Sequence, residues 1–132
     1  MHPNVPDDVR WLVHECVPSM EHVEVLLLLA RDEERAWSVD EIRQKVTVAA
    51  DALPAVVARL EDAGLIVART DDPAAPGTRY AFRPKGVKER SAVASLMRMY
   101  DMRPVSLIRF VYERPADTAR LFADAFKLRK PT

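Results

Sequence analysis

Glycine and cysteine are both scarce in this sequence, and each shortage excludes a class of site. The only glycines are Gly64, Gly77 and Gly86, and their spacing forms neither a dinucleotide-binding nor a P-loop signature. Enzymes that cradle phosphates in glycine-rich loops are therefore not expected. Cys16 is the only cysteine, so an internal disulfide is excluded and nothing indicates an oxidising compartment.

Long apolar runs are also missing. The longest, residues 25–30, is far shorter than the roughly 20 apolar residues that a transmembrane helix needs. The opening MHPNVPDD lacks the basic and then apolar order of a signal peptide. Among the 132 residues, 48% are hydrophobic and 30% charged, which is typical of a globular domain. We therefore expect a cytoplasmic protein with no membrane association.

Candidate catalytic and metal-binding groups are few. His14, Cys16 and His22 lie close together in the sequence, beside Glu15 and Glu21, and such groups could form a transition-metal site or a thiol sensor. However, H-x-C spacing does not place two ligands on one helix face, and Cys16 falls on an apolar stripe. The favoured interpretation is a buried cysteine with surface histidines. We expect no cofactor, no metal and no enzymatic activity.

The net charge of zero conceals a strong asymmetry between the two halves of the chain. Residues 1–66 carry six Arg or Lys against thirteen Asp or Glu, whereas residues 67–132 carry fourteen against seven. A basic second half could form the footprint of a nucleic acid. Equally, the two halves could attract each other within one subunit or across a dimer.

Apolar residues at three- and four-residue spacing predict a mainly helical fold. Ser19 is a suitable N-cap for one helix, and Ser38 with Glu41 forms a capping box that begins another. Gly64 is suited to end a third helix as a left-handed C-cap. The expected helices span residues 7–16, 19–30, 39–45, 50–63, 87–100 and 116–128.

A small β-hairpin is expected between these helices. Residues 65–70 and 78–83 are extended in pattern, and the loop between them, residues 71–77, is rich in proline and ends at a glycine. Residues 104–112 (PVSLIRFVY) fit either a helix that begins at Pro104 or a strand, and period alone leaves both open.

The stretch from Trp37 to Ile66 begins with a short strand at Trp37. It continues with the spacing S/T-x-x-E-[LI], a hydrophobic-small-hydrophobic turn, and a longer helix that ends in G-L-[IV] before the hairpin. This pattern resembles the winged helix-turn-helix domains of MarR-like bacterial transcriptional regulators, and it covers about half of the chain. The resemblance implies a helix at residues 1–18, the winged domain at 19–85 and a helical extension at 86–132. The matching positions are Ser38, Glu41, Ile42, Val46, Thr47, Val48, Leu53, Val57, Leu60, Gly64, Leu65 and Ile66.

The resemblance implies a homodimeric regulator that binds double-stranded DNA. Residues 50–63 would enter the major groove, and residues 65–83 would form a wing against the backbone. The outward side of the helix is rich in alanine, and only Arg59 could pair with guanine there. The expected DNA-contacting residues are Arg43, Lys45, Thr47, Arg59, Arg69, Arg79, Arg83 and Lys85.

Two alternatives remain open. The hairpin cations could simply be solvated charges that prevent strand addition, and the chain could be a winged-helix adaptor that binds another protein through its acidic first half. Aromatic residues gather at Trp11 and Trp37 and again near the C-terminus. Core and dimer packing is the favoured use of these side chains, and an effector pocket is the alternative.

Overall fold

The computed structural model describes residues 5–70 and 77–113, which form a mainly helical fold with a small three-stranded antiparallel sheet. The mainly helical class with a β-hairpin is confirmed. The predicted helix at 116–128 and nearly all of the predicted loop at 71–77 lie outside the described residues. The elements are α1 (Asp7–Glu15), α2 (Met20–Ala30), β1 (Trp37–Ser38), α3 (Val39–Lys45), α4 (Leu53–Asp62), β2 (Ile66–Arg69), β3 (Arg79–Phe82), α5 (Val87–Met102) and α6 (Pro104–Glu113).

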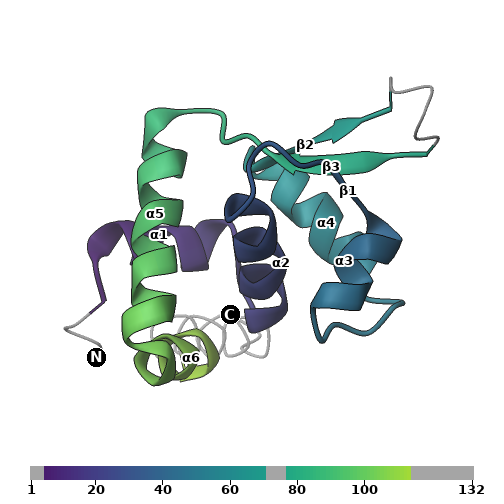
Figure 1. Ribbon diagram of the computed structural model, residues 1–132. Helices are drawn as coiled ribbons and strands as arrows, with labels where there is room; N and C mark the ends of the chain where they lie inside the picture. The colour runs from purple at the N-terminus through teal and green to yellow at the C-terminus, as the bar shows by residue number, and fades with distance from the viewer. Residues whose placement is uncertain (1–4, 71–76, 114–132) are drawn as a thin grey trace, which may run out of the picture.

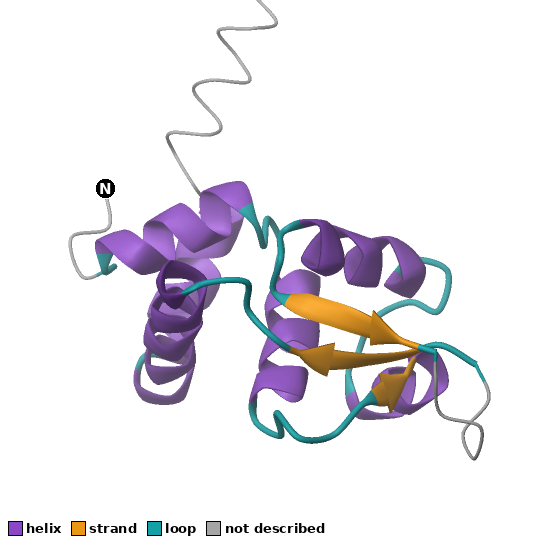
Figure 2. Cartoon of the chain, turned by 90° about the horizontal axis from the view of Figure 1, so that it is seen from above, coloured by secondary structure: helices purple, strands orange, loops and turns teal. Residues whose placement is uncertain are grey.

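Helix α2 lies at the centre of the molecule. It contacts α3, α4 and β3 on one side and α5 and α6 on the other, while α1 packs across α5 (Figure 1). Seen from above, the sheet lies on the opposite side of α2 from α1 and α5 (Figure 2). Six of the eleven residues of α2 are buried, which explains the almost uninterrupted apolar sequence of this helix. In the described part of the chain, no helix has the length and apolar character needed to cross a membrane.

The predicted helix starts at Ser19 and Ser38 are confirmed. The Ser19 hydroxyl accepts a hydrogen bond from the His22 amide at 3.4 Å. The Ser38 hydroxyl accepts from the Glu41 amide at 3.1 Å, and the Glu41 carboxylate accepts from the Ser38 amide at 2.9 Å. Both halves of the capping box are therefore present, and they satisfy amides that the first turn of α3 leaves unpaired.

Helix α4 begins later than residue 50, where the sequence placed its start. The Ala52 and Leu53 amides both donate to the Ala49 carbonyl, which makes a turn before the helix. Pro54 then occupies the second position of α4. Because amides in the first turn have no partner within the helix, the missing N–H of a proline costs little there. The proline sets the start, and the predicted boundary was wrong by three residues.

The end of α4 is as predicted. Gly64 adopts a left-handed conformation with φ of 76°. Its amide donates to the Glu61 carbonyl, and the Leu65 amide donates back to the Leu60 carbonyl, which is the hydrogen-bond pattern of a Schellman motif. Leu65 is fully buried. The chain thereby turns directly from α4 into the sheet.

The predicted hairpin is present, and the short strand expected at Trp37 joins it as a third strand. β3 pairs with β2 in the register Val67 to Ala81, and its other edge pairs with β1 in the register Trp37 to Tyr80. The order is β1-β3-β2, so β2 has a free edge within the described structure. The strand β1 leads straight into α3 and ties the base of α3 to the hairpin.

Residues 104–112 are helical, which resolves the alternative that the sequence left open. Arg103 leaves the helical conformation with φ of −140° and ψ of 62°, and α6 then begins at Pro104. Leu107, Phe110 and Val111 are buried against the rest of the molecule. A strand would direct alternate side chains to opposite faces, whereas the helix places these three on one.

Candidate nucleic-acid interface

The outer face of α4 and the turn before it is exposed to solvent, as the sequence predicted. Alanines dominate this surface, and acidic side chains lie near both of its ends, at Asp51, Glu61 and Asp62. Among its side chains only Arg59 is a long hydrogen-bond donor. The exposed positions are Ala49, Ala50, Asp51, Pro54, Ala55, Ala58 and Arg59.

Arg59 has a partner inside the molecule. Its Nη2 donates to the carbonyl oxygen of Glu15, the last residue of α1, at 2.9 Å. The contact places a cation at a helix C-terminus, where the unpaired carbonyls favour positive charge. Arg59 therefore links α4 to α1. The guanidinium would have to leave this contact, or share its remaining N–H groups, in order to pair with a base.

Arg79 also has intramolecular partners, which the sequence did not predict. Its Nη1 donates to Glu41 Oε1 at 2.7 Å and to the Ala36 carbonyl at 3.3 Å, and its side chain is only 30% exposed. The same Glu41 carboxylate completes the capping box of α3. Arg79 thus braces the hairpin against α3, and its charge is neutralised there. Arg79 is therefore less available to an anionic partner than the exposed cations of the hairpin region.

Arg35 is a cation that the sequence analysis missed. Its guanidinium stacks on the Trp37 ring, 3.6 Å from the ring centroid, and its Nη2 lies 3.4 Å from Glu41 Oε2. Two arginines thus share one carboxylate, and the group keeps a net positive charge. The signal in the sequence was the two-residue spacing between Arg35 and Trp37, which puts them on the same face of an extended segment.

The pKa of Glu41 is held below its ordinary value of 4.5, chiefly by the hydrogen bond from the Ser38 amide and also by the neighbouring Arg79. A depressed pKa in the folded state means that the ionised form stabilises the fold above the unfolded pKa. This stabilisation is lost as the pH falls from about 4.5 through the lower folded value.

We therefore expect Glu41→Gln to flatten the acid limb of the stability profile. Urea unfolding of the wild type should show a stability loss below about pH 4.5 that Glu41→Gln shows less steeply. Glu34→Gln, at an exposed turn position, is the matched control and should keep the wild-type slope. Equal slopes for wild type and Glu41→Gln would contradict the assigned role of this carboxylate.

The candidates near the connection between α3 and α4 are solvent-exposed. Arg43 pairs with Asp40 at 3.1 Å, one turn earlier in α3. Lys45 and Thr47 are exposed, and Lys45 borders a hollow of about 140 Å³ that also includes Arg31 and Tyr100. Surface pairs such as that of Arg43 contribute little to stability and exchange readily, so Arg43 can still turn to a phosphate.

Three exposed cations lie at or next to the strands of the hairpin. Arg69 ends β2, while Arg83 and Lys85 follow β3 and border an open hollow of about 560 Å³ beside β2. Strand geometry separates Arg69 from Arg83 by roughly 13 Å along the hairpin. No ion pair within the described ranges involves any of the three, although Glu61 borders the same hollow. They are the cations most available to an anionic partner.

The charge asymmetry of the sequence is partly used inside the molecule. Arg79 and Arg90 of the second half pair with Glu41 and Glu33 of the first half, at 2.7 and 2.9 Å. Lys88 lies over the Trp11 ring, 4.1 Å from its centroid. The two halves of the chain therefore attract each other, and the second half still keeps exposed cations, such as Arg69, Arg83 and Lys85, that form no ion pair with a described residue.

The cluster of histidines and cysteine in the first two helices is not arranged as a metal site. Among the described residues, no group of three His, Cys, Asp or Glu side chains could hold a metal ion. Burial raises the pKa of the Cys16 thiol, and burial lowers the pKa of His22. The His22 Nδ1 lies 2.6 Å from the Ser19 hydroxyl at the start of α2. These features fit packing and capping at the junction of α1 and α2.

In comparisons with protein-family models, curated proteins and solved structures, nothing matches this chain.

Proposed function

We propose that the chain is a winged helix-turn-helix protein that binds double-stranded DNA as a transcriptional regulator. The observation that carries the proposal is a set of exposed cations, Arg69, Arg83 and Lys85, that form no ion pair with a described residue. They lie at the end of β2 and just after β3, in the hairpin region that directly follows α4. In this proposal α3 corresponds to the bracing helix, α4 to the helix in the major groove and the hairpin to the wing.

The expected binding depends more on the DNA backbone than on base sequence. Small side chains such as Ala55 and Ala58 on the outer face of α4 allow close approach to a groove but offer no hydrogen bonds to base edges. Arg59 is held by the Glu15 carbonyl. The hairpin cations contact phosphates, which fix position without reading sequence.

The test is the binding of mixed-sequence duplex DNA by the wild-type chain at several salt concentrations. The logarithm of the association constant should fall linearly with the logarithm of salt concentration, with a slope of about −0.9 for each phosphate contact. Fluorescence anisotropy of a labelled duplex measures this. Absence of any salt-dependent binding at low ionic strength would exclude the DNA-binding proposal.

A protein-binding adaptor is the second candidate. The observation that favours it is the exposed face of α4, whose alanines lie beside Asp51, Glu61 and Asp62 and would repel phosphates. The salt titration separates the two candidates, because an adaptor that uses this acidic surface would not bind duplex DNA.

A homodimer forms part of the regulator proposal, and α6 offers a face for it. Val105, Ile108 and Tyr112 are 67%, 40% and 73% exposed and lie on one side of α6, beside Met102 at 77%. Apolar side chains gathered on one exposed helix face usually meet a partner surface. A second copy of the same chain, related by a two-fold axis, would cover both faces at once.

We expect Val105→Glu with Tyr112→Glu to weaken dimerisation at least tenfold, because two charges would be buried without partners. Sedimentation equilibrium measures the dissociation constant. Val87→Glu is the matched control, since Val87 is 82% exposed but lies at the start of α5, outside the α6 face. An unchanged dimer in the folded double variant would place the interface elsewhere.

A further inference from the structure

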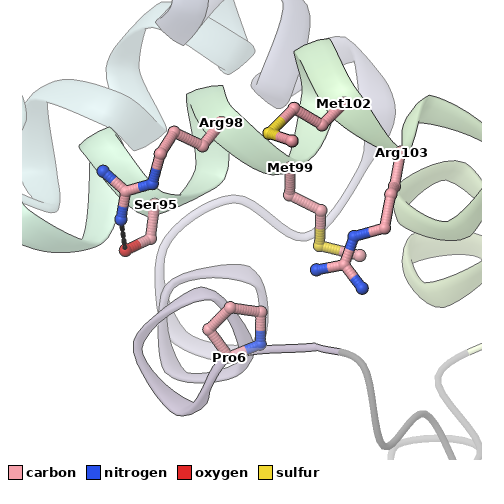
Figure 3. Close-up of a pocket in the computed structure, with 6 residues that line it drawn as sticks. All are labelled: Pro6, Ser95, Arg98, Met99, Met102 and Arg103. Atoms are coloured by element: carbon pink, nitrogen blue, oxygen red, sulfur yellow. Dashed lines mark hydrogen bonds between the residues drawn. The ribbon is translucent and has the colours of Figure 1, made fainter.

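A second candidate binding site lies at the end of α5 that is remote from the sheet. A cavity of about 290 Å³ opens there between the start of α1 and the last turns of α5 (Figure 3). This volume is at the small end of the range for ligand sites and equals the space of roughly ten water molecules. The lining residues are Pro6, Ser95, Arg98, Met99, Met102 and Arg103.

One wall of the cavity is a short hydrogen-bonded chain. Ser95 is 8% exposed, and its hydroxyl donates to Asp8 Oδ2 at 2.6 Å and accepts from Arg98 Nη2 at 3.1 Å. The other oxygen of Asp8 accepts from the Val9 amide at 2.9 Å. Asp8 therefore orients Ser95, and Ser95 in turn fixes the guanidinium of Arg98 at the edge of the cavity. Arg98 donates no other side-chain hydrogen bond to a described residue.

A second guanidinium comes from the break between α5 and α6. The backbone at Arg103 departs from helical geometry, and its side chain turns back over the cavity toward Pro6 and Met99 (Figure 3). No ion pair between described residues involves Arg98 or Arg103. Two arginines thus border one cavity, and the Asp8 carboxylate next to Ser95 is already engaged by the Ser95 hydroxyl.

The remaining walls are apolar. Met99 is 2% exposed and lies at the base, Met102 is 77% exposed at the rim, and Pro6 closes the side formed by the start of α1. Methionine side chains adapt to the shape of an apolar group. The cavity therefore combines two guanidinium groups, whose planar N–H donors match a carboxylate, with a flexible apolar lining.

We propose that this cavity binds a small organic monocarboxylate, with the carboxylate between Arg98 and Arg103 and a short apolar body against Met99 and Met102. Its size limits the ligand to roughly ten non-hydrogen atoms. The site is independent of the proposed DNA interface, since it shares no residue with α4 or the hairpin.

Hexanoate is a suitable probe, with hexan-1-ol, hexylammonium and inorganic phosphate as matched comparisons. Isothermal titration calorimetry on the full chain should show saturable binding of one hexanoate per chain. The alcohol, the ammonium ion and phosphate should each bind at least tenfold more weakly, because each lacks either the carboxylate or the apolar body. Tight phosphate binding would indicate a bare anion site and overturn the proposal.

The variant Arg98→Gln with Arg103→Gln should weaken hexanoate binding at least tenfold. Both side chains are exposed, so the variant should remain folded, which circular dichroism checks. Arg109→Gln, at an exposed position of α6 outside the cavity, should bind as the wild type does. Unchanged binding by the folded double variant, or no saturable binding up to about 10 mM hexanoate, would refute the site.

Discussion

Replacing all three hairpin cations by glutamine, in the variant Arg69→Gln, Arg83→Gln, Lys85→Gln, should weaken binding of mixed duplex DNA by about a hundredfold at low salt. Each lost phosphate contact removes about 0.9 from the salt slope, so the slope should become shallower by nearly three units per subunit. The three side chains are exposed and carry no ion pair with a described residue. Their loss should leave the stability of the fold almost unchanged.

Two single variants separate this effect from a general loss of positive charge. Arg31→Gln removes a 43% exposed cation that pairs with Asp101 at the end of α5, and it should leave DNA binding and the salt slope intact. Arg79→Gln removes a cation already neutralised by Glu41, so it should lower stability more than it lowers affinity. If the triple variant binds DNA with the wild-type salt slope, the hairpin is not part of the DNA interface.

Local signals in the sequence predicted the helices and their caps well. Ser19, Ser38 with Glu41, and Gly64 each specify a boundary through their own hydrogen bonds or backbone conformation, and all three are confirmed. The start of α4 was predicted too early because the helical period continues back through the alanines. The cost of a proline inside a helix was the stronger signal and should have decided the boundary.

The contacts of the candidate site were less predictable, because they join residues distant in sequence. Arg79 reaches Glu41 only because β1 pairs with β3 in one particular register. Arg59 reaches Glu15 only because α1 ends beside α4. Charge and exposure of a side chain follow from local pattern, whereas its partner depends on how the elements pack. Arg69 and Arg83 are exposed cations for which packing supplied no carboxylate among the described residues.

We expect both sides of the molecule to unfold together, because both pack on α2. The side with the sheet and the side with α1 and α5 each pack on this helix. We expect Leu26→Ala, at a fully buried position of α2, to lower the free energy of unfolding by about 3 to 4 kcal/mol, since it leaves a cavity in that shared core. This is a large share of the roughly 5 to 15 kcal/mol typical of a domain.

The two tryptophans make this prediction measurable on each side separately. Trp11 lies in α1 and Trp37 in β1, so the backgrounds Trp11→Phe and Trp37→Phe each leave one fluorescent reporter. Urea unfolding should give the same midpoint for both reporters, and Leu26→Ala should shift both equally. Leu28→Ala, at a half-buried position of the same helix, should cost about 1 kcal/mol, because less apolar surface returns to water. Separate midpoints, or a shift confined to one tryptophan, would show that the two sides unfold independently and that α2 does not couple them.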